Sequence, residues 1–386
     1  MRPTVDTSRL YDETLDADLD GIRKLADHAA RNIFSSALAE PGGLRTSTFL
    51  GPAIADDARA DLAAITRRGF RKGLLDYLVE TGRVAMDDDG TVLALPGLAI
   101  SAAERAQASA LASAHATFAD VRELLGVLER RAPDLLRGVD GIAILRDTLG
   151  FERMQVLWER LTLQLPQRLV ERTLGAELLL DRMRQQQIGV TVLECGAGVG
   201  SVLRRALELP DFLSGLDALE RYVYTDINPF LVEWSKDWFW RNAPRTLVDR
   251  MEFKVLNLDS IGSPGAPEAS SIDLVLLDDV AHDVVDLQAT LEGLGRLLTA
   301  DGWLAMTENF RQPPGDFMFI EIFPMTFHSY NKARLRPGTR ESRGFMTLPE
   351  WRASLAAAGF GEVHVFPDPQ HHRCWPMGSI VALRRP

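Results

Sequence analysis

A strand, a glycine-rich turn and a helix follow one another between residues 188 and 209, and this order constrains the fold more than any other stretch. Val190, Val192 and Leu193 form a short apolar run typical of a buried strand. The turn that follows reads Glu194-Cys195-Gly196-Ala197-Gly198-Val199-Gly200. Glycine allows a tight turn and lets a ligand lie against the backbone, because it has no Cβ. The stretch is therefore predicted to open a nucleotide-binding α/β unit.

The spacing of the glycines separates this turn from the dinucleotide-binding fingerprint. That fingerprint is G-x-G-x-x-G, whereas this chain has E-x-G-x-G-x-G, with Glu194 first and Gly196, Gly198 and Gly200 after it. A carboxylate in the first place suits a ligand that has amino or ammonium groups and no pyrophosphate. S-adenosylmethionine (SAM) is such a ligand. A glycine-rich turn can also be a tight connection that binds no ligand. Whether this turn binds one is therefore judged from the strands that follow it.

From residue 189 onward, strands and helices alternate, which predicts a parallel sheet. The predicted strands 222–226, 251–256, 272–277 and 303–307 are each followed by or end in polar residues. Ligands of such sheets bind at the carboxyl ends of the strands. The residues expected at that edge are Asp226, Asn257, Leu258, Asp259, Asp278 and Glu308. Asp226 follows the last glycine by 26 residues, where this fold places the acid that binds ribose hydroxyls.

The first 180 residues are predicted to be mostly helical. Apolar residues recur at helical spacing over 19–33 and 58–81, and one helical stretch is expected over 101–131. A hairpin is predicted around Asp87-Asp88-Asp89-Gly90. A helix followed by a hairpin is typical of a winged-helix element, but the acidic turn argues against DNA binding. We therefore divide the chain into a helical N-terminal lobe, 1–180, which covers the site as a lid or only packs, and a cofactor-binding core, 181–386.

The composition excludes several classes of protein. Hydrophobic residues make up 46% of the 386 residues and charged ones 25%, as in a soluble protein with a sizeable core. The net charge of -11 disfavours a nucleic-acid binder. No apolar run reaches the roughly 18 residues of a membrane span, and the N-terminus lacks a signal-peptide core. Cys195 and Cys374 suggest neither disulfides nor a zinc site, so no metal and a reducing, cytoplasmic location are expected.

These motifs resemble the C-methyltransferase domain of polyketide synthases, within the class I SAM-dependent methyltransferases. The matching stretches are 192–200, 224–229, 251–256, 280–283 and 297–304. The resemblance implies an α/β fold with a seven-stranded Rossmann-like sheet and a helical N-terminal lobe. It also implies SAM as cofactor and S-adenosylhomocysteine as product. Residue by residue, the implied cofactor site consists of Glu194, Gly196, Gly198, Gly200, Asp226, Ile227, Asn257, Leu258, Asp259 and Asp278.

The catalytic pair of that family is a histidine after the fourth strand and a glutamate at the end of the fifth, which correspond to His282 and Glu308. A carbon between a ketone and a thioester must lose a proton before it attacks the methyl group, and histidine titrates near neutral pH. A carboxylate on the second ring nitrogen fixes the tautomer and stabilises the imidazolium. Both residues are also compatible with purely structural roles, as a hydrogen-bonded histidine and a salt-bridged glutamate at strand ends.

Two features depart from the family. Asp279 stands where the family has asparagine, and the segment 323–334 replaces a tryptophan-rich stretch. That segment is expected to line the acceptor pocket, with His328, Tyr330 and Arg334 as substrate residues. The resemblance therefore indicates which cofactor is bound, but it leaves the identity of the methyl acceptor open.

A run of arginines extends this segment. Arg334, Arg336, Arg340 and Arg343 are candidates for binding a phosphopantetheine phosphate or a substrate carboxylate, unless they form a solvated loop. The primary expectation is methylation of an activated α-carbon in a β-keto acyl or keto-acid substrate, free or bound to a carrier protein, by a free-standing enzyme. Methylation of oxygen or nitrogen on a free small molecule remains open, as does a catalytically silent SAM-binding or carrier-docking module. A homodimer through the N-terminal lobe is a further expectation.

Overall fold

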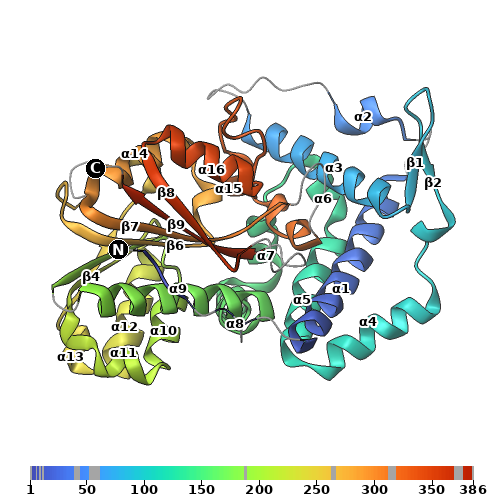
Figure 1. Cartoon of the computed structure of the whole chain (residues 1–386). Helices are drawn as coiled ribbons and strands as arrows, with labels where there is room; N and C mark the ends of the chain where they lie inside the picture. Colours follow the sequence, from blue (N-terminus) through green and yellow to red (C-terminus); the bar gives the residue numbers. More distant parts are fainter. Residues whose placement is uncertain are drawn as a thin grey trace. The chain divides into compact units, whose positions relative to one another are not determined.

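The computed structural model describes residues 2–5, 7, 10, 13–38, 44–51, 61–186, 189–261, 267–311, 319–368 and 377–384. Cys374 lies outside these ranges. The chain forms two compact units, which Figure 1 shows coloured along the sequence. The core unit consists of Met1–Asp12, Gln167–Phe310 and Arg336–Pro386. The helical unit consists of Glu13–Pro166 and Arg311–Leu335.

A seven-stranded sheet with the order β5-β4-β3-β6-β7-β9-β8 forms the centre of the core unit. Its strands are β3 (Val190–Cys195), β4 (Leu219–Asp226), β5 (Met251–Val255), β6 (Ile272–Asp278), β7 (Leu298–Asn309), β8 (Phe360–Phe366) and β9 (Met377–Arg384). The five strands β3 to β7 pair in parallel, and β9 is antiparallel to β7 and β8. The chain runs from β3 outward to β5 and then returns to β6 on the other side of β3. The strand order thus reverses between β3 and β6, and sheets of this kind bind their ligands at the carboxyl ends of the strands at such a point.

Helices cover both faces of the sheet (Figure 1). The core unit contains α9 (Pro166–Gln186), α10 (Ser201–Leu207), α11 (Pro210–Ser214), α12 (Pro229–Asn242), α13 (Arg245–Val248), α14 (Leu287–Leu297) and α16 (Leu348–Ala357). Successive side chains of a strand point to opposite faces, so β3 contributes Val192 to one apolar core and Leu193 to the other. The first core includes residues of α9, α10 and α12, and the second includes residues of α14 and α16.

The helical unit contains α1 (Glu13–Leu38), α2 (Thr46–Leu50), α3 (Leu62–Glu80), α4 (Ala102–Ala114), α5 (Ala116–Arg130), α6 (Ala132–Arg137), α7 (Gly141–Leu149), α8 (Phe151–Gln164) and α15 (His328–Asn331). The predicted hairpin is present as β1 (Val84–Met86) paired with β2 (Val92–Ala94). The stretch predicted to be helical over 101–131 is helical, but it is divided into α4 and α5 at His115. His115 is extended, and its Nδ1 accepts a hydrogen bond from the amide of Thr117 in the first turn of α5. Among the described helices, none combines the length and the apolar character that crossing a membrane requires.

Candidate active site

The glycine turn after β3 leaves backbone exposed to a ligand at one position. Gly196, Gly198 and Gly200 all have positive φ, at 63°, 57° and 78°. A Cβ on Gly196 would lie 2.5 Å from Val280, and one on Gly200 would lie 2.9 Å from Phe239. On Gly198 the nearest atom would be a backbone oxygen at 3.9 Å. Packing therefore requires two of the glycines, whereas the third keeps an open cradle above the backbone.

Asp226, at the carboxyl end of β4, is hydrogen-bonded to this turn. Its Oδ2 accepts from the amide of Gly198 at 2.9 Å and its Oδ1 accepts from the amide of Asn228 at 2.8 Å. Burial raises the pKa of Asp226, and these backbone donors oppose the rise. The next residue, Ile227, exposes 57% of its surface. An acid and an apolar side chain thus lie at the strand end where the sequence predicted a ribose contact.

The residues after β5 form a capped 3-10 turn. Asn257 Oδ1 accepts from the amide of Asp259 at 3.0 Å, and both residues are exposed. Asp259 Oδ1 accepts from the amide of Val285 at 2.6 Å. The side chain of Leu258 lies in the second apolar core. Of these three residues of the predicted cofactor site, Asn257 and Asp259 therefore offer polar side chains, and Leu258 offers its backbone.

Two buried carboxylates near the turn each have an oxygen atom without a hydrogen-bond partner among the described residues. Glu194 accepts from the Tyr222 hydroxyl at 2.7 Å through Oε2, and its Oε1 has no partner. Burial raises the pKa of Glu194 to about 8. Asp278 accepts from the Ser201 hydroxyl at 2.7 Å through Oδ2, and its Oδ1 has no partner. Since buried polar atoms are normally paired, these acceptors and the open cradle at Gly198 fit a ligand that carries amino groups, such as SAM.

His282 and Glu308 form a buried pair at the same edge of the sheet. His282 lies in a 3-10 turn, η4 (Ala281–Asp283), after β6, and Glu308 lies near the end of β7. The Nδ1 of His282 is 2.7 Å from Oε2 of Glu308, and Glu308 Oε1 accepts from the amide of Ala281 at 2.8 Å. Both side chains are less than 5% exposed. Because Nδ1 faces a carboxylate, it carries the proton, and Nε2 is the nitrogen that can accept one.

The surroundings of His282 favour its charged form. Burial opposes the imidazolium, but the carboxylates of Glu308, Asp283 and Asp279 outweigh burial and raise the pKa of His282 to about 10. Asp283 lies 3.6 Å from Nε2, and Asp279 lies 3.8 Å from Nδ1. These carboxylates therefore favour the protonated ring, and a positive charge that approaches it would favour the neutral one.

Arg168 neutralises this acidic edge, and nothing in the local sequence predicted its role. It lies at the start of α9, with Nη1 2.7 Å from Asp279 Oδ2 and Nη2 3.3 Å from Asp278 Oδ2, and it also pairs with Glu171. Asn309 donates to Glu171 at 2.9 Å and to Asp279 at 3.1 Å. Asp279 adopts a positive φ of 54°. The aspartate that replaces the family's asparagine thus has a half-buried arginine as its counter-ion.

Potential metal ligands are also brought together here. One ligand atom from each of Asp279, His282 and Glu308 lies within 4.8 Å of the others. However, Arg168 and Asn309 already bond the carboxylate of Asp279, and Glu308 bonds Nδ1 of His282. Hydrogen bonds and ion pairs account for the cluster without an ion.

The three predicted substrate residues lie in the helical unit, whereas all the predicted cofactor and catalytic residues lie in the core unit. His328 donates its amide to Asp140 Oδ1 at 3.0 Å, and its Nε2 lies 3.2 Å from the carbonyl of Gly138. Tyr330 is 3% exposed and its hydroxyl donates to Glu321. Arg334 is exposed. The first two side chains thus have structural partners within their own unit.

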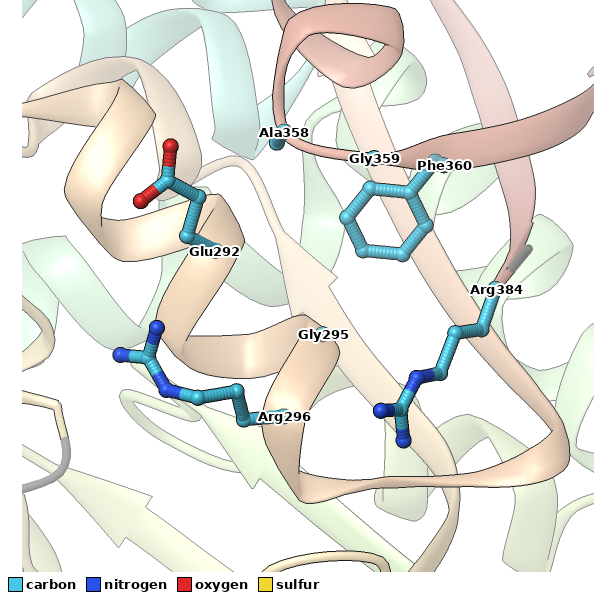
Figure 2. Close-up of a pocket in the computed structure, with 7 residues that line it drawn as sticks. All are labelled: Glu292, Gly295, Arg296, Ala358, Gly359, Phe360 and Arg384. Carbon is cyan, nitrogen blue, oxygen red and sulfur yellow. The ribbon is translucent and has the colours of Figure 1, made fainter. Parts of the chain in front are cut away.

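A surface pocket of about 260 Å³ lies in the core unit, and Figure 2 shows the residues that line it. It contains none of the predicted site residues, and its lining consists of Glu292, Gly295, Arg296, Ala358, Gly359, Phe360 and Arg384. Arg384 donates to the carbonyl of Leu298, the first residue of β7, at 2.8 Å. The pocket therefore lies by the amino end of this strand, away from the candidate residues at the carboxyl ends of the strands.

Comparison with known proteins finds polyketide synthases and a methyltransferase among the relatives, although no family model matches the chain. A highly reducing polyketide synthase, NEC1 of Pyricularia oryzae, is 29% identical over 198 residues, which are 50% of this chain and 7% of the synthase. The methyltransferase calH of Penicillium decumbens is 28% identical over 190 residues, 48% of either protein. The matched region is thus less than two thirds of each relative. No residue role follows from these identities alone.

Solved structures share the fold. The carbon methyltransferase DszA superposes with a TM-score of 0.75 at 21% identity, covering 100% of this chain and 97% of the other. The trans-methyltransferase CalH, solved in complex with S-adenosylhomocysteine (SAH), has a TM-score of 0.65 at 17% identity, covering 100% and 93%. The class I methyltransferase fold and the resemblance to polyketide C-methyltransferases, both predicted from the sequence, are confirmed.

Proposed function

We propose that this protein is a SAM-dependent C-methyltransferase that methylates the activated α-carbon of a β-keto acyl or keto-acid substrate in polyketide-type biosynthesis. The observation that carries the proposal is the buried His282–Glu308 pair, 2.7 Å apart, at the sheet edge that also holds the glycine turn. The named relatives and the shared fold support the same reaction class. The acceptor is free or presented by a carrier protein.

The core unit has the residues to hold the cofactor. The cradle at Gly198 accommodates the ligand, Asp226 and Ile227 lie where a ribose and an adenine edge would be bound, and Glu194 and Asp278 offer free acceptor oxygens. When bound, SAM supplies an electrophilic methyl group next to a positive sulfur. Asn257 and Asp259 are proposed to contact the adenine amino group.

His282 acts as the general base in this mechanism. Its Nε2 takes the α-proton of the acceptor, whose ketone and thioester delocalise the remaining electron pair. Glu308 holds Nδ1, keeps the ring in one tautomer and stabilises the imidazolium after proton transfer. The pair thereby makes the carbon nucleophilic.

Methylation of oxygen or nitrogen is a second candidate, motivated by the segment 323–334, which departs from the family pattern. His282 would deprotonate a hydroxyl by the same route. A methyl group labelled with deuterium distinguishes the two, because mass-spectrometric fragmentation and NMR place the label on carbon or on the heteroatom.

The test uses a β-ketoacyl thioester with deuterated SAM, and compares wild type with His282→Gln and a matched control, His364→Gln on β8. We expect a labelled α-methyl product from wild type and the control, and a loss of roughly 10²- to 10⁴-fold in His282→Gln, with SAH affinity by calorimetry retained. Undiminished turnover in His282→Gln would contradict the base role. Failure to bind either SAM or SAH would instead favour a catalytically silent carrier-docking module.

A further inference from the structure

Arg340 is a buried arginine that bonds the backbone of the turn carrying His282. It is 2% exposed. Its Nη2 donates to the carbonyl oxygen of His282, and its Nη1 donates to the carbonyl oxygen of Val284 at 3.2 Å. A guanidinium group presents its N–H donors in a rigid plane. Hydrogen bonds from a charged donor are stronger than hydrogen bonds between neutral groups. These bonds fix the peptide planes on the C-terminal side of His282, so Arg340 is neither a solvated side chain nor an exposed anion-binding group.

The segment that carries Arg340, residues 336–346, is itself firmly held, and we call it the strap. Arg336 and Arg340 exchange two backbone hydrogen bonds, at 2.7 and 2.9 Å. The Nε of Arg340 donates to the carbonyl of Ser342 at 3.3 Å. The amides of Glu341 and Ser342 donate to Glu350 Oε1 in the first turn of α16, at 2.7 and 3.0 Å. The guanidinium is therefore preorganised where it meets the turn.

The strap also contacts the imidazole ring. Phe345 packs edge to face on His282, with ring centroids 4.7 Å apart at 64°. Glu308 bonds the amide of Ala281 on one side of the turn, and Asp259 bonds the amide of Val285 on the other. The strap adds two contacts to these: Arg340 bonds the backbone carbonyl of His282, and Phe345 packs on its ring.

We propose that Arg340 is a positioning residue for the base, which aims Nε2 of His282 at the acceptor by clamping the carbonyl groups of the turn. This inference rests on the proposed function, in which Nε2 takes the α-proton. A displacement of about 1 Å in a reacting group costs on the order of 10²-fold in rate. Arg340 acts through His282 and has no assigned contact with the acceptor or the cofactor.

Kinetics of three variants test the proposal. Arg340→Met keeps the aliphatic stem and removes the donors, Arg340→Lys keeps the charge without the fork, and Arg352→Met changes an exposed arginine of α16 as a matched control. We expect Arg340→Met to lower kcat roughly 10- to 100-fold with KM for SAM and Kd for SAH within about twofold, Arg340→Lys to fall between, and Arg352→Met to equal wild type. Unchanged kcat in Arg340→Met, or an equal loss of SAH affinity, would overturn the proposal.

A spectroscopic measurement tests it without turnover. The Nδ1–H proton of His282 should give a downfield NMR signal, which is identified by its loss in His282→Gln. We expect this signal to shift or broaden in Arg340→Met and to stay in place in Arg352→Met. An identical signal in Arg340→Met refutes the positioning role, even if wild type methylates no acceptor and the proposed function itself fails. If Arg340→Met does not fold, the same comparison is made with Arg340→Lys.

Discussion

The imidazole of His282 lies among carboxylates that favour its protonated form, and this has a consequence for pH. Its pKa is raised from 6.5 to about 10, whereas only the neutral ring can accept a proton. Burial of the ring opposes the rise, and the positive sulfur of SAM would oppose it further when the cofactor is bound. We expect kcat/KM for the acceptor, at saturating SAM, to increase with pH above neutrality and to level off by about pH 10.

The same carboxylates predict in which direction a substitution shifts the pH profile of kcat/KM. Asp283 is one of the charges that raise the pKa of His282, so Asp283→Asn should move the ascending limb of the profile to lower pH. Asp237→Asn, at an exposed position on α12, serves as the control and should leave the limb in place. Coincident limbs for wild type and Asp283→Asn would contradict the electrostatic account of the base.

At the scale of elements, two glycines of the turn are expected to have different roles: Gly200 is required for packing, and Gly198 for ligand binding. Alanine at Gly198 or Gly200 costs about 1–2 kcal/mol for a positive φ. At Gly200 the new Cβ also meets Phe239 at 2.9 Å, which should lower the free energy of unfolding by a further ~1–3 kcal/mol. At Gly198 the Cβ instead fills the cradle, so SAH affinity should fall about tenfold or more. Urea unfolding and calorimetry check both, and equal stability of the two variants would contradict this division.

Arg168 is the cation that pairs with three carboxylates where α9 meets the end of β6. Arg168→Met removes the counter-ion of the buried Glu171 and Asp278 and of the half-buried Asp279, which should cost about 3–5 kcal/mol of unfolding free energy. The double variant with Asp279→Asn removes one of the three charges and should recover part of that loss. Urea unfolding of the single and double variants measures both effects. A loss below about 1 kcal/mol would show that water, rather than Arg168, compensates these carboxylates.

The elements of the core were predictable because each depends on nearby residues. The apolar run before Glu194 and the polar residues after each strand predicted β3 to β7 and the edge of the sheet where the candidate residues lie. The break at His115 was missed because no glycine or proline marks it. Arg168 and Arg340 were not assigned their roles because their partners lie 110 and 58 residues away, and only the packed sheet brings them together.

At the scale of the whole molecule, the predicted cofactor and catalytic residues all belong to the core unit, and the helical unit contains none of them. A ligand that binds only the folded form of a unit stabilises that unit against unfolding by RT ln(1 + [L]/Kd). At a ligand concentration of 100 times Kd this is about 2.7 kcal/mol. Amides of the core unit that exchange through its global opening should therefore exchange about 100-fold more slowly with SAH present.

Hydrogen exchange followed by mass spectrometry measures this segment by segment, at SAH concentrations of zero and 100 times Kd. We expect protection in peptides from β3, the glycine turn, β4 and the segment 257–259, and unchanged exchange in peptides from α1 and α5 of the helical unit. Gly198→Ala at the same SAH concentration is the control and should lose most of the protection. Equal protection of α1 and α5 would contradict the assignment of the cofactor residues to the core unit, because it would require ligand contacts or coupling that the helical unit itself provides.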